Sequence, residues 1–126
     1  MTTFRSPLPI LFLAFLALLL SGAVLMAGAD SGHVKQLRTT GSCNNCDLRD
    51  AELPGLVAEL ADLRNADLRG AMMYKAILRD ANFTGALLAF ANLKGADLSN
   101  ARGANLSDAI TDEYTKCPGG SAGPCK

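Results

Sequence analysis

Apolar residues recur every five positions between residues 46 and 103. Alanine opens most of the five-residue units, and a large apolar residue stands two positions after it. A step of five positions turns each side chain by about 140° around an α-helix, so no continuous apolar stripe can form on one. A flat β-strand also fails, because its side chains alternate with a period of two and successive leucines would reach opposite faces.

A chain that turns a corner once in every unit accommodates this period. The alanine and the large apolar residue are two positions apart, so both point to the same side of a short extended segment. The other three residues turn the chain and face water. Repeated bending in one sense produces a solenoid, in which each unit buries its apolar face against its neighbours. The residues expected to form the inward ladder of large side chains are Leu48, Leu53, Leu63, Leu68, Met73, Leu78, Phe83, Leu88, Leu93 and Leu98.

The units ADLRN at 61–65 and ANLKG at 91–95 closely resemble the pentapeptide-repeat family, whose units read A-[D/N]-L-x-x. The resemblance covers twelve units in unbroken register. It implies an all-β fold, a right-handed quadrilateral β-helix with four repeats to a coil and with the leucine and the small residue before it pointing inward. By that analogy the repeats make about three coils, and the rod is ~14 Å tall at the usual strand spacing.

The ends of the repeats predict the domain organisation. The five-residue register stops at Ala104, which follows the alanine of the last unit by only three positions. We therefore expect the β-helix to cover 46–108, and a C-terminal cap with a flexible tail rich in cysteine, glycine and proline to cover 109–126. Residues 30–45 are expected to be a linker and N-terminal cap, with a short capping helix over 31–40 and Ser31 as its N-cap.

The N-terminal segment, residues 1–29, predicts export. Arg5 precedes an unbroken apolar run from Ile10 to Leu20, which has the length of the apolar region of a signal peptide and is too short to span a bilayer alone. Residues 27–29 read AGA, a signal-peptidase cleavage pattern. A secreted or periplasmic protein is expected. The alternative is an uncleaved membrane anchor, which would also place the repeats outside the cytoplasm.

The charge balance gives no indication of a nucleic-acid partner. The chain has 12 acidic and 12 basic residues, and only one of these, Arg5, precedes residue 30. A near-neutral chain has no polybasic groove. Some cytoplasmic pentapeptide-repeat proteins regulate topoisomerases by mimicking DNA, but this role requires a negatively charged rod in the cytosol, and it is the least favoured alternative. Contact with a membrane is expected only if the N-terminal segment stays uncleaved.

Two cysteines, Cys43 and Cys46, stand at the start of the repeats, and two others, Cys117 and Cys125, follow them. Four cysteines allow three pairings. A disulfide needs Cα atoms within about 7 Å, whereas the rod would separate its ends by ~14 Å unless the tail folds back. The local pairs, 43 with 46 and 117 with 125, are therefore favoured.

The C-x-x-C motif at 43–46 also has functional alternatives. A redox-active motif normally opens a helix in a βαβ unit, and nothing in the sequence predicts one. A zinc site would need all four thiols reduced and at one end of the rod, which an exported protein does not favour. Haem attachment is excluded, because Asp47 rather than histidine follows the motif. We expect a structural disulfide and no metal or cofactor, with a thiol-redox or metal-binding protein as the alternative.

No catalytic constellation is recognisable, and the single histidine, His33, is expected to be a solvated linker residue. The Asp and Asn residues of the second position are expected to form turns.

The outward positions also contain apolar exceptions, which predict a surface for a protein partner or for self-association. These candidate interface residues are Val57, Leu60, Met72, Tyr74, Ile77, Leu87 and Phe90. With four repeats to a coil, as the resemblance implies, Val57 lies directly beneath Ile77. The sequence thus predicts a non-enzymatic structural or protein-interaction module.

Overall fold

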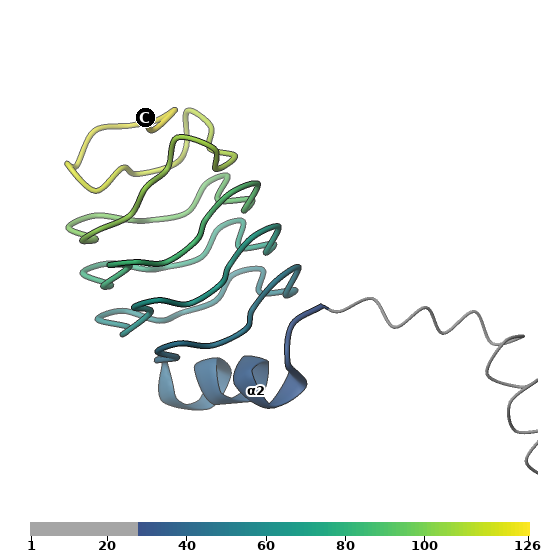
Figure 1. The fold of residues 1–126 in the computed structure, drawn as a ribbon. Coiled ribbons are helices and arrows are strands. Elements are labelled where there is room, and N and C mark those ends of the chain that lie inside the picture. Colours follow the sequence, from purple (N-terminus) through teal and green to yellow (C-terminus); the bar gives the residue numbers. More distant parts are fainter. Residues whose placement is uncertain (1–27) are drawn as a thin grey trace, which may run out of the picture.

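The computed structural model describes residues 28–126, so most of the predicted signal peptide or anchor lies outside the described residues. The chain winds into a stack of four-sided turns, with helix α2 (Ser31–Thr40) at one end and the C-terminus at the other (Figure 1). Within residues 28–126, no helix combines the length and the hydropathy needed to cross a bilayer.

The turns of the stack are held together by pairing between residues twenty positions apart. Residues at the second position of each unit form parallel β-bridges with their counterparts one layer on, as Val57 does with Ile77. Hydrogen bonds flank each bridge; Leu48 N donates to Asp67 O at 2.8 Å, and Asp67 N donates to Cys46 O at 2.9 Å. Each side contributes one bridged residue per layer, and the described residues contain no longer strand. The stacking of Val57 with Ile77 is the one expected from four repeats to a coil, which the family resemblance implies.

We name the four sides of the stack by their first bridged residue. They are the Asp47 side (47, 67 and 87), the Glu52 side (52, 72 and 92), the Val57 side (57, 77 and 97) and the Asp62 side (62, 82 and 102). The corners between neighbouring sides consist of the fourth and fifth residues of each unit. The same five-residue rule therefore assigns every outward side chain to a side or to a corner.

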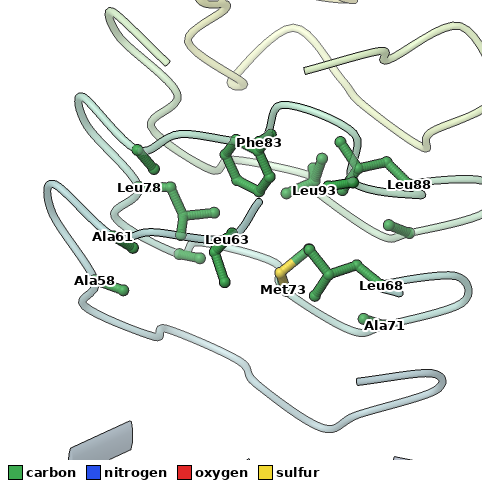
Figure 2. Packing of buried hydrophobic residues seen from close by; sticks show 14 of the residues in the cluster. Ala58, Ala61, Leu63, Leu68, Ala71, Met73, Leu78, Phe83, Leu88 and Leu93 are labelled. Carbon is green, nitrogen blue, oxygen red and sulfur yellow. The ribbon is translucent and has the colours of Figure 1, made fainter. Parts of the chain in front are cut away.

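The large apolar residues of the repeats form a continuous column inside the stack (Figure 2). All ten residues of the predicted inward ladder are at most 3% exposed. The first-position alanines are also buried and complete each layer. In the unit 56–60 the order is reversed, yet Leu56 and Ala58 both remain buried. The exchange keeps the apolar volume inside the layer, which is the kind of change that cores tolerate best.

The polar positions of the units make the turns. The carboxylate of Asp62 accepts a hydrogen bond from the amide of Arg64 at 3.2 Å, and the side chain of Asn82 accepts one from Thr84 at 3.1 Å. The fifth residue of each unit adopts the left-handed conformation, with φ of 57° at Asn65 and 69° at Gly70. Asn, Asp and Gly tolerate this conformation, which explains their recurrence at the corners.

Helix α2 lies against the first layer (Figure 1) and differs from expectation in two details. Its N-cap is Asp30 rather than Ser31, since the Asp30 carboxylate accepts hydrogen bonds from the amides of Gly32 and His33. His33 is not a free linker residue either, because its Nδ1 accepts a hydrogen bond from the Asp47 amide at 3.0 Å. In later layers the equivalent amide donates to the layer below. At the open end of the stack, His33 supplies the missing acceptor, and Leu37 of α2 is fully buried.

Pairing continues past residue 108, where we expected the β-helix to end. Asn92 pairs with Ile110 and Asp97 pairs with Lys116, at separations shorter than twenty residues. The tail 118–124, expected to be mobile, follows a defined path over the last layer. Lys116 pairs with Ala122 in antiparallel orientation, and the amide of Gly123 donates to Thr115 O at 2.7 Å. The disulfide between 117 and 125, expected from the sequence, closes this loop. The path of the loop over the last layer does not follow from the repeat pattern.

Candidate functional site

Six of the seven candidate interface residues expose a large part of their side chains. Leu60 is 77% exposed, Phe90 73% and Val57 66%, and Met72, Tyr74 and Leu87 are exposed to a lesser degree. Ile77 is half-buried. Exposed apolar side chains on a small protein carry meaning only where they gather, so their distribution over the sides decides what they can bind.

The seven residues do not form one patch. Val57 and Ile77 lie on the Val57 side, and Met72 lies on the neighbouring Glu52 side. Leu87 belongs to the Asp47 side, with the corner residue Phe90 following it. Leu60 stands at the corner between the Val57 and Asp62 sides. A single flat partner could cover only part of this set, because the sides face different directions.

Two exposed apolar residues, Ile110 and Tyr114, were missed by sequence reasoning, and Tyr114 is 74% exposed. They follow the point where the five-residue register ends, so the pattern assigned them to no side. Ile110 pairs with Asn92 and therefore extends the Glu52 side. Tyr114 stands at the next corner. A search for apolar residues beyond the register could have drawn attention to them, but not to their position.

Three corners carry bulky residues in a conformation that such residues avoid. Leu60, Lys75 and Phe90 have φ of 59°, 58° and 61°, whereas Asn, Asp or Gly occupies the other fifth positions of the repeats. The left-handed conformation costs an ordinary L-residue roughly 1–2 kcal/mol. Strain of this kind persists where the surrounding structure enforces it and is concentrated at functional positions. These three corners are therefore the parts of the surface least explained by folding alone.

The four cysteines form two disulfides, 43 with 46 and 117 with 125, with Cα separations of 5.4 and 5.5 Å. This is the local pairing that the sequence favours. Cys43 and Cys46 are 0% and 3% exposed, and the Cys43 sulfur contacts the His33 carbonyl under α2. Thiol exchange requires access of a thiolate to a disulfide sulfur. The burial of this pair disfavours redox catalysis, and a disulfide sulfur cannot ligate zinc as a thiolate.

Charged side chains on the sides pair locally. Arg49, Arg64 and Arg69 each form an ion pair with the carboxylate two residues earlier, at 2.6 to 2.8 Å. The hydrogen bond from Arg49 lowers the pKa of Asp47 to about 2, and that from Arg64 has the same effect on Asp62. These pairs are exposed to solvent, where each contributes little to stability. In each pair the two charges neutralise each other locally.

Asp97 differs, because it is only 8% exposed. It accepts hydrogen bonds from Arg79 Nε at 2.8 Å and from Lys116 Nζ at 3.2 Å, and the Ser99 hydroxyl donates to its other oxygen. Burial raises the pKa of the Asp97 carboxyl, but the hydrogen bonds from Ser99, Arg79 and Lys116 outweigh it and hold that pKa well below its ordinary value. Arg79 thus forms ion pairs with both Asp97 and Glu59.

Within residues 28–126, no group of three or more His, Cys, Asp or Glu side chains has a geometry suited to a metal ion. The carboxylates that recur along the sides are committed to turns and to arginine. The second-position Asp and Asn residues thus act as turn formers. What the described surface offers chemically is a set of fixed apolar and charged side chains at layer spacing.

Comparison with known proteins identifies the repeats. The family model for pentapeptide repeats matches residues 42–80 and 76–110 with eight copies, which is more than half of the chain. The chain belongs to the pentapeptide-repeat family. Pentapeptide-repeat proteins fold as right-handed quadrilateral β-helices, in agreement with the twenty-residue pairing of the four sides. No curated protein matches the sequence significantly.

Two solved structures of pentapeptide-repeat proteins are similar to this one. A protein from the cyanobacterium Cyanothece 51142 shares 20% identity with a TM-score of 0.33, over 68% of this chain and 97% of that chain. HetL from Nostoc sp. strain PCC 7120, a protein involved in the regulation of heterocyst differentiation, shares 26% identity with a TM-score of 0.18, over 64% of this chain. This pentapeptide-repeat protein matches 46% of the length of HetL.

Proposed function

We propose that this pentapeptide-repeat protein is an exported, non-catalytic module that binds a protein partner or a second copy of itself. The repeats supply a rigid rod of about three coils, and α2 caps the end of the rod that begins at Cys46. Members of the family are generally non-catalytic. Since a fold does not assign a role, the role has to be inferred from the surface.

Leu60 and Phe90 are the observation that supports binding. Both side chains are more than 70% exposed, and both residues adopt the left-handed conformation. Each position therefore combines an exposed apolar group with a strained backbone, although asparagine would remove both costs. A partner that buries either side chain would compensate for the two costs at that corner.

Export is supported by the apolar N-terminal run with its AGA pattern at residues 27–29. The two disulfides also support it, because disulfides form and persist in oxidising compartments such as the periplasm and the extracellular space. Together these features favour a secreted or periplasmic protein over a cytoplasmic one.

Isolated from its native host, the protein is expected to begin near Asp30. Signal peptidase cleaves after small residues such as those at 27–29, and removal of residues 1–29 leaves only the cap and the repeats. Intact-mass spectrometry of the native product measures this directly. A mass that retains residues 1–29, together with recovery in the membrane fraction, would show that the segment is an uncleaved anchor.

Replacement of Leu60 and Phe90 together by asparagine is expected to weaken self-association or partner capture tenfold or more. Truncation of a buried apolar anchor costs an interface about 1–2 kcal/mol. The variant should be as stable as the unmodified protein, or more stable by about 0.5–1 kcal/mol per site, because asparagine tolerates the left-handed backbone. Analytical ultracentrifugation and urea denaturation measure the two effects.

The matched control is Arg64→Ala, which changes an exposed side chain of the rod and should leave association unchanged. The single variants at Leu60 and Phe90 identify which corner carries the contact. Full association in the double variant, combined with loss of biological activity in a normally folded Cys43→Ser/Cys46→Ser variant, would replace the interaction module with the thiol alternative.

A further inference from the structure

The corner between the Glu52 and Val57 sides is hollowed. The hollow has a volume of about 320 Å³, and the exposed rings of Tyr74 and Tyr114 stand at it. Gly95 forms part of its wall, and the missing side chain at this position leaves the space open. The volume is at the lower end of what small-ligand sites occupy, and it suits one or two amino-acid side chains rather than a large cofactor.

The hollow has a built floor. Asp112 Oδ1 accepts hydrogen bonds from the amide of Gly95 at 2.9 Å and from the amide of Tyr114 at 3.1 Å. The same oxygen contacts the hydroxyl of Thr115, which is fully buried. One carboxylate thus ties the C-terminal segment that carries Tyr114 to the corner of the layer below. A surface fixed in this way loses little conformational entropy when it binds a partner.

Two lysines at the hollow lack an acidic partner. Among the described residues, Lys75 and Lys94 form no ion pair, whereas Arg49, Arg64, Arg69, Arg79 and Lys116 all do. Asp112 contributes one negative charge, so the lining keeps a net positive charge of one. Lys75 also holds the left-handed conformation in which asparagine or glycine would be less strained. The charge and the strain occur at the same place.

A second, larger hollow near Phe90 provides a contrast. It measures about 430 Å³, and its lining includes Arg49 and Arg69. Both arginines are already paired, with Asp47 and Asp67. An anionic ligand would have to displace these carboxylates there. The hollow at Gly95 requires no such exchange.

We propose that the hollow at Gly95 binds an acidic segment of a partner protein, in which a carboxylate side chain stands beside an aliphatic one. The tyrosine rings provide a rigid amphipathic surface for the aliphatic group. The ammonium groups of Lys75 and Lys94 bind the carboxylate by charge-assisted hydrogen bonds. This inference rests on the proposed interaction function and names the chemistry that its partner presents.

The test is a titration of the isotopically labelled domain, residues 30–126 with both disulfides intact, followed by amide NMR spectra. The probe is the peptide acetyl-Glu-Leu-Glu-amide, and the matched control peptide is acetyl-Gln-Leu-Gln-amide. The acidic peptide is expected to shift the amide signals of Lys94, Gly95 and Tyr114, with a dissociation constant on the order of 1 mM or below. The neutral peptide is expected to bind at least tenfold more weakly, and added salt should weaken the acidic one.

Variants locate the interaction. Lys75→Gln/Lys94→Gln is expected to weaken binding of the acidic peptide tenfold or more, and Tyr114→Ala is expected to weaken it to a similar extent. The control is Lys35→Gln on α2, which should bind the peptide like the unmodified protein. All these side chains are exposed, so the amide spectra should otherwise match and verify the fold.

Three results would overturn the proposal. They are equal binding of the neutral peptide, peptide-induced shifts confined to another side, and tighter binding of an oligomer of uronic acid than of the acidic peptide. The last result would identify a glycan site in place of a peptide site. If the peptide fails to bind while the Leu60→Asn/Phe90→Asn variant still loses association, this inference alone is wrong. If the peptide fails to bind and the double variant keeps full association, the interaction function is wrong as well.

Discussion

Replacement of Leu68 by aspartate is expected to unfold the repeat domain. Leu68 is fully buried, and its backbone amide donates to Leu87 O of the next layer at 2.9 Å. Loss of the leucine removes about 1.5–3 kcal/mol of apolar burial, and a carboxylate left in the core costs more. A domain of this size has about 5–15 kcal/mol of net stability at most, so one such change removes most of it. Circular dichroism and urea denaturation measure the loss.

The matched control is the same substitution at Leu60, which is exposed at a corner. Leu60→Asp is expected to leave the domain folded, because aspartate tolerates the left-handed conformation of that position. Arg69→Ala should also be nearly silent, since it removes only a solvent-exposed ion pair with Asp67. Equal loss of structure in Leu68→Asp and Leu60→Asp would contradict the assignment of inward and outward positions.

Removal of the C-terminal disulfide is expected to lower the free energy of unfolding by about 2.5 kcal/mol. The bond between Cys117 and Cys125 closes a loop of nine residues, and the chain-entropy relation gives this magnitude for that length. The double serine variant, Cys117→Ser/Cys125→Ser, should unfold at lower urea concentration. Its tail amides, such as that of Gly123, should lose protection from hydrogen exchange.

The other disulfide provides the comparison. In Cys43→Ser/Cys46→Ser the tail amides should keep their protection, while the amides next to α2, such as that of Asp47, should exchange faster. The two variants thus loosen opposite ends of the rod, because each bond closes a local loop. Unchanged stability and unchanged exchange at Gly123 in the first variant would mean that the disulfide does not hold the tail.

The inward ladder, the four-sided stacking and the local disulfides could all be inferred from the sequence. Each unit inside the stack lies between similar units in the neighbouring layers, so the environment of a position repeats with the pattern. Leu68 is buried for the same reason as Leu48 and Leu88, which lie twenty residues away on the same side. The local period predicts this long-range contact once the resemblance to the family supplies four repeats to a coil.

The ends of the rod were predictable only in part, because there the repeat loses a neighbour. The Asp47 amide has no layer below it, and its acceptor is the ring of His33, which lies fourteen residues earlier and outside the repeats. Likewise the N-cap proved to be Asp30, whose amide donates to Asp47 O of the first layer at 3.1 Å. Neither partner follows from a repeating motif.

The candidate site shows the same contrast between positions inside the repeats and positions beyond them. The sequence by itself determined which outward positions break the polar pattern, among them Leu60, Tyr74 and Phe90. Only the tertiary structure decided that they face different directions, and that Tyr114 meets the corner of Gly95 through Asp112. The physical reason is that register within the repeats is set by a fixed local period, whereas the contacts of the irregular C-terminal segment are set by the hydrogen bonds and the packing that the last layer leaves unsatisfied.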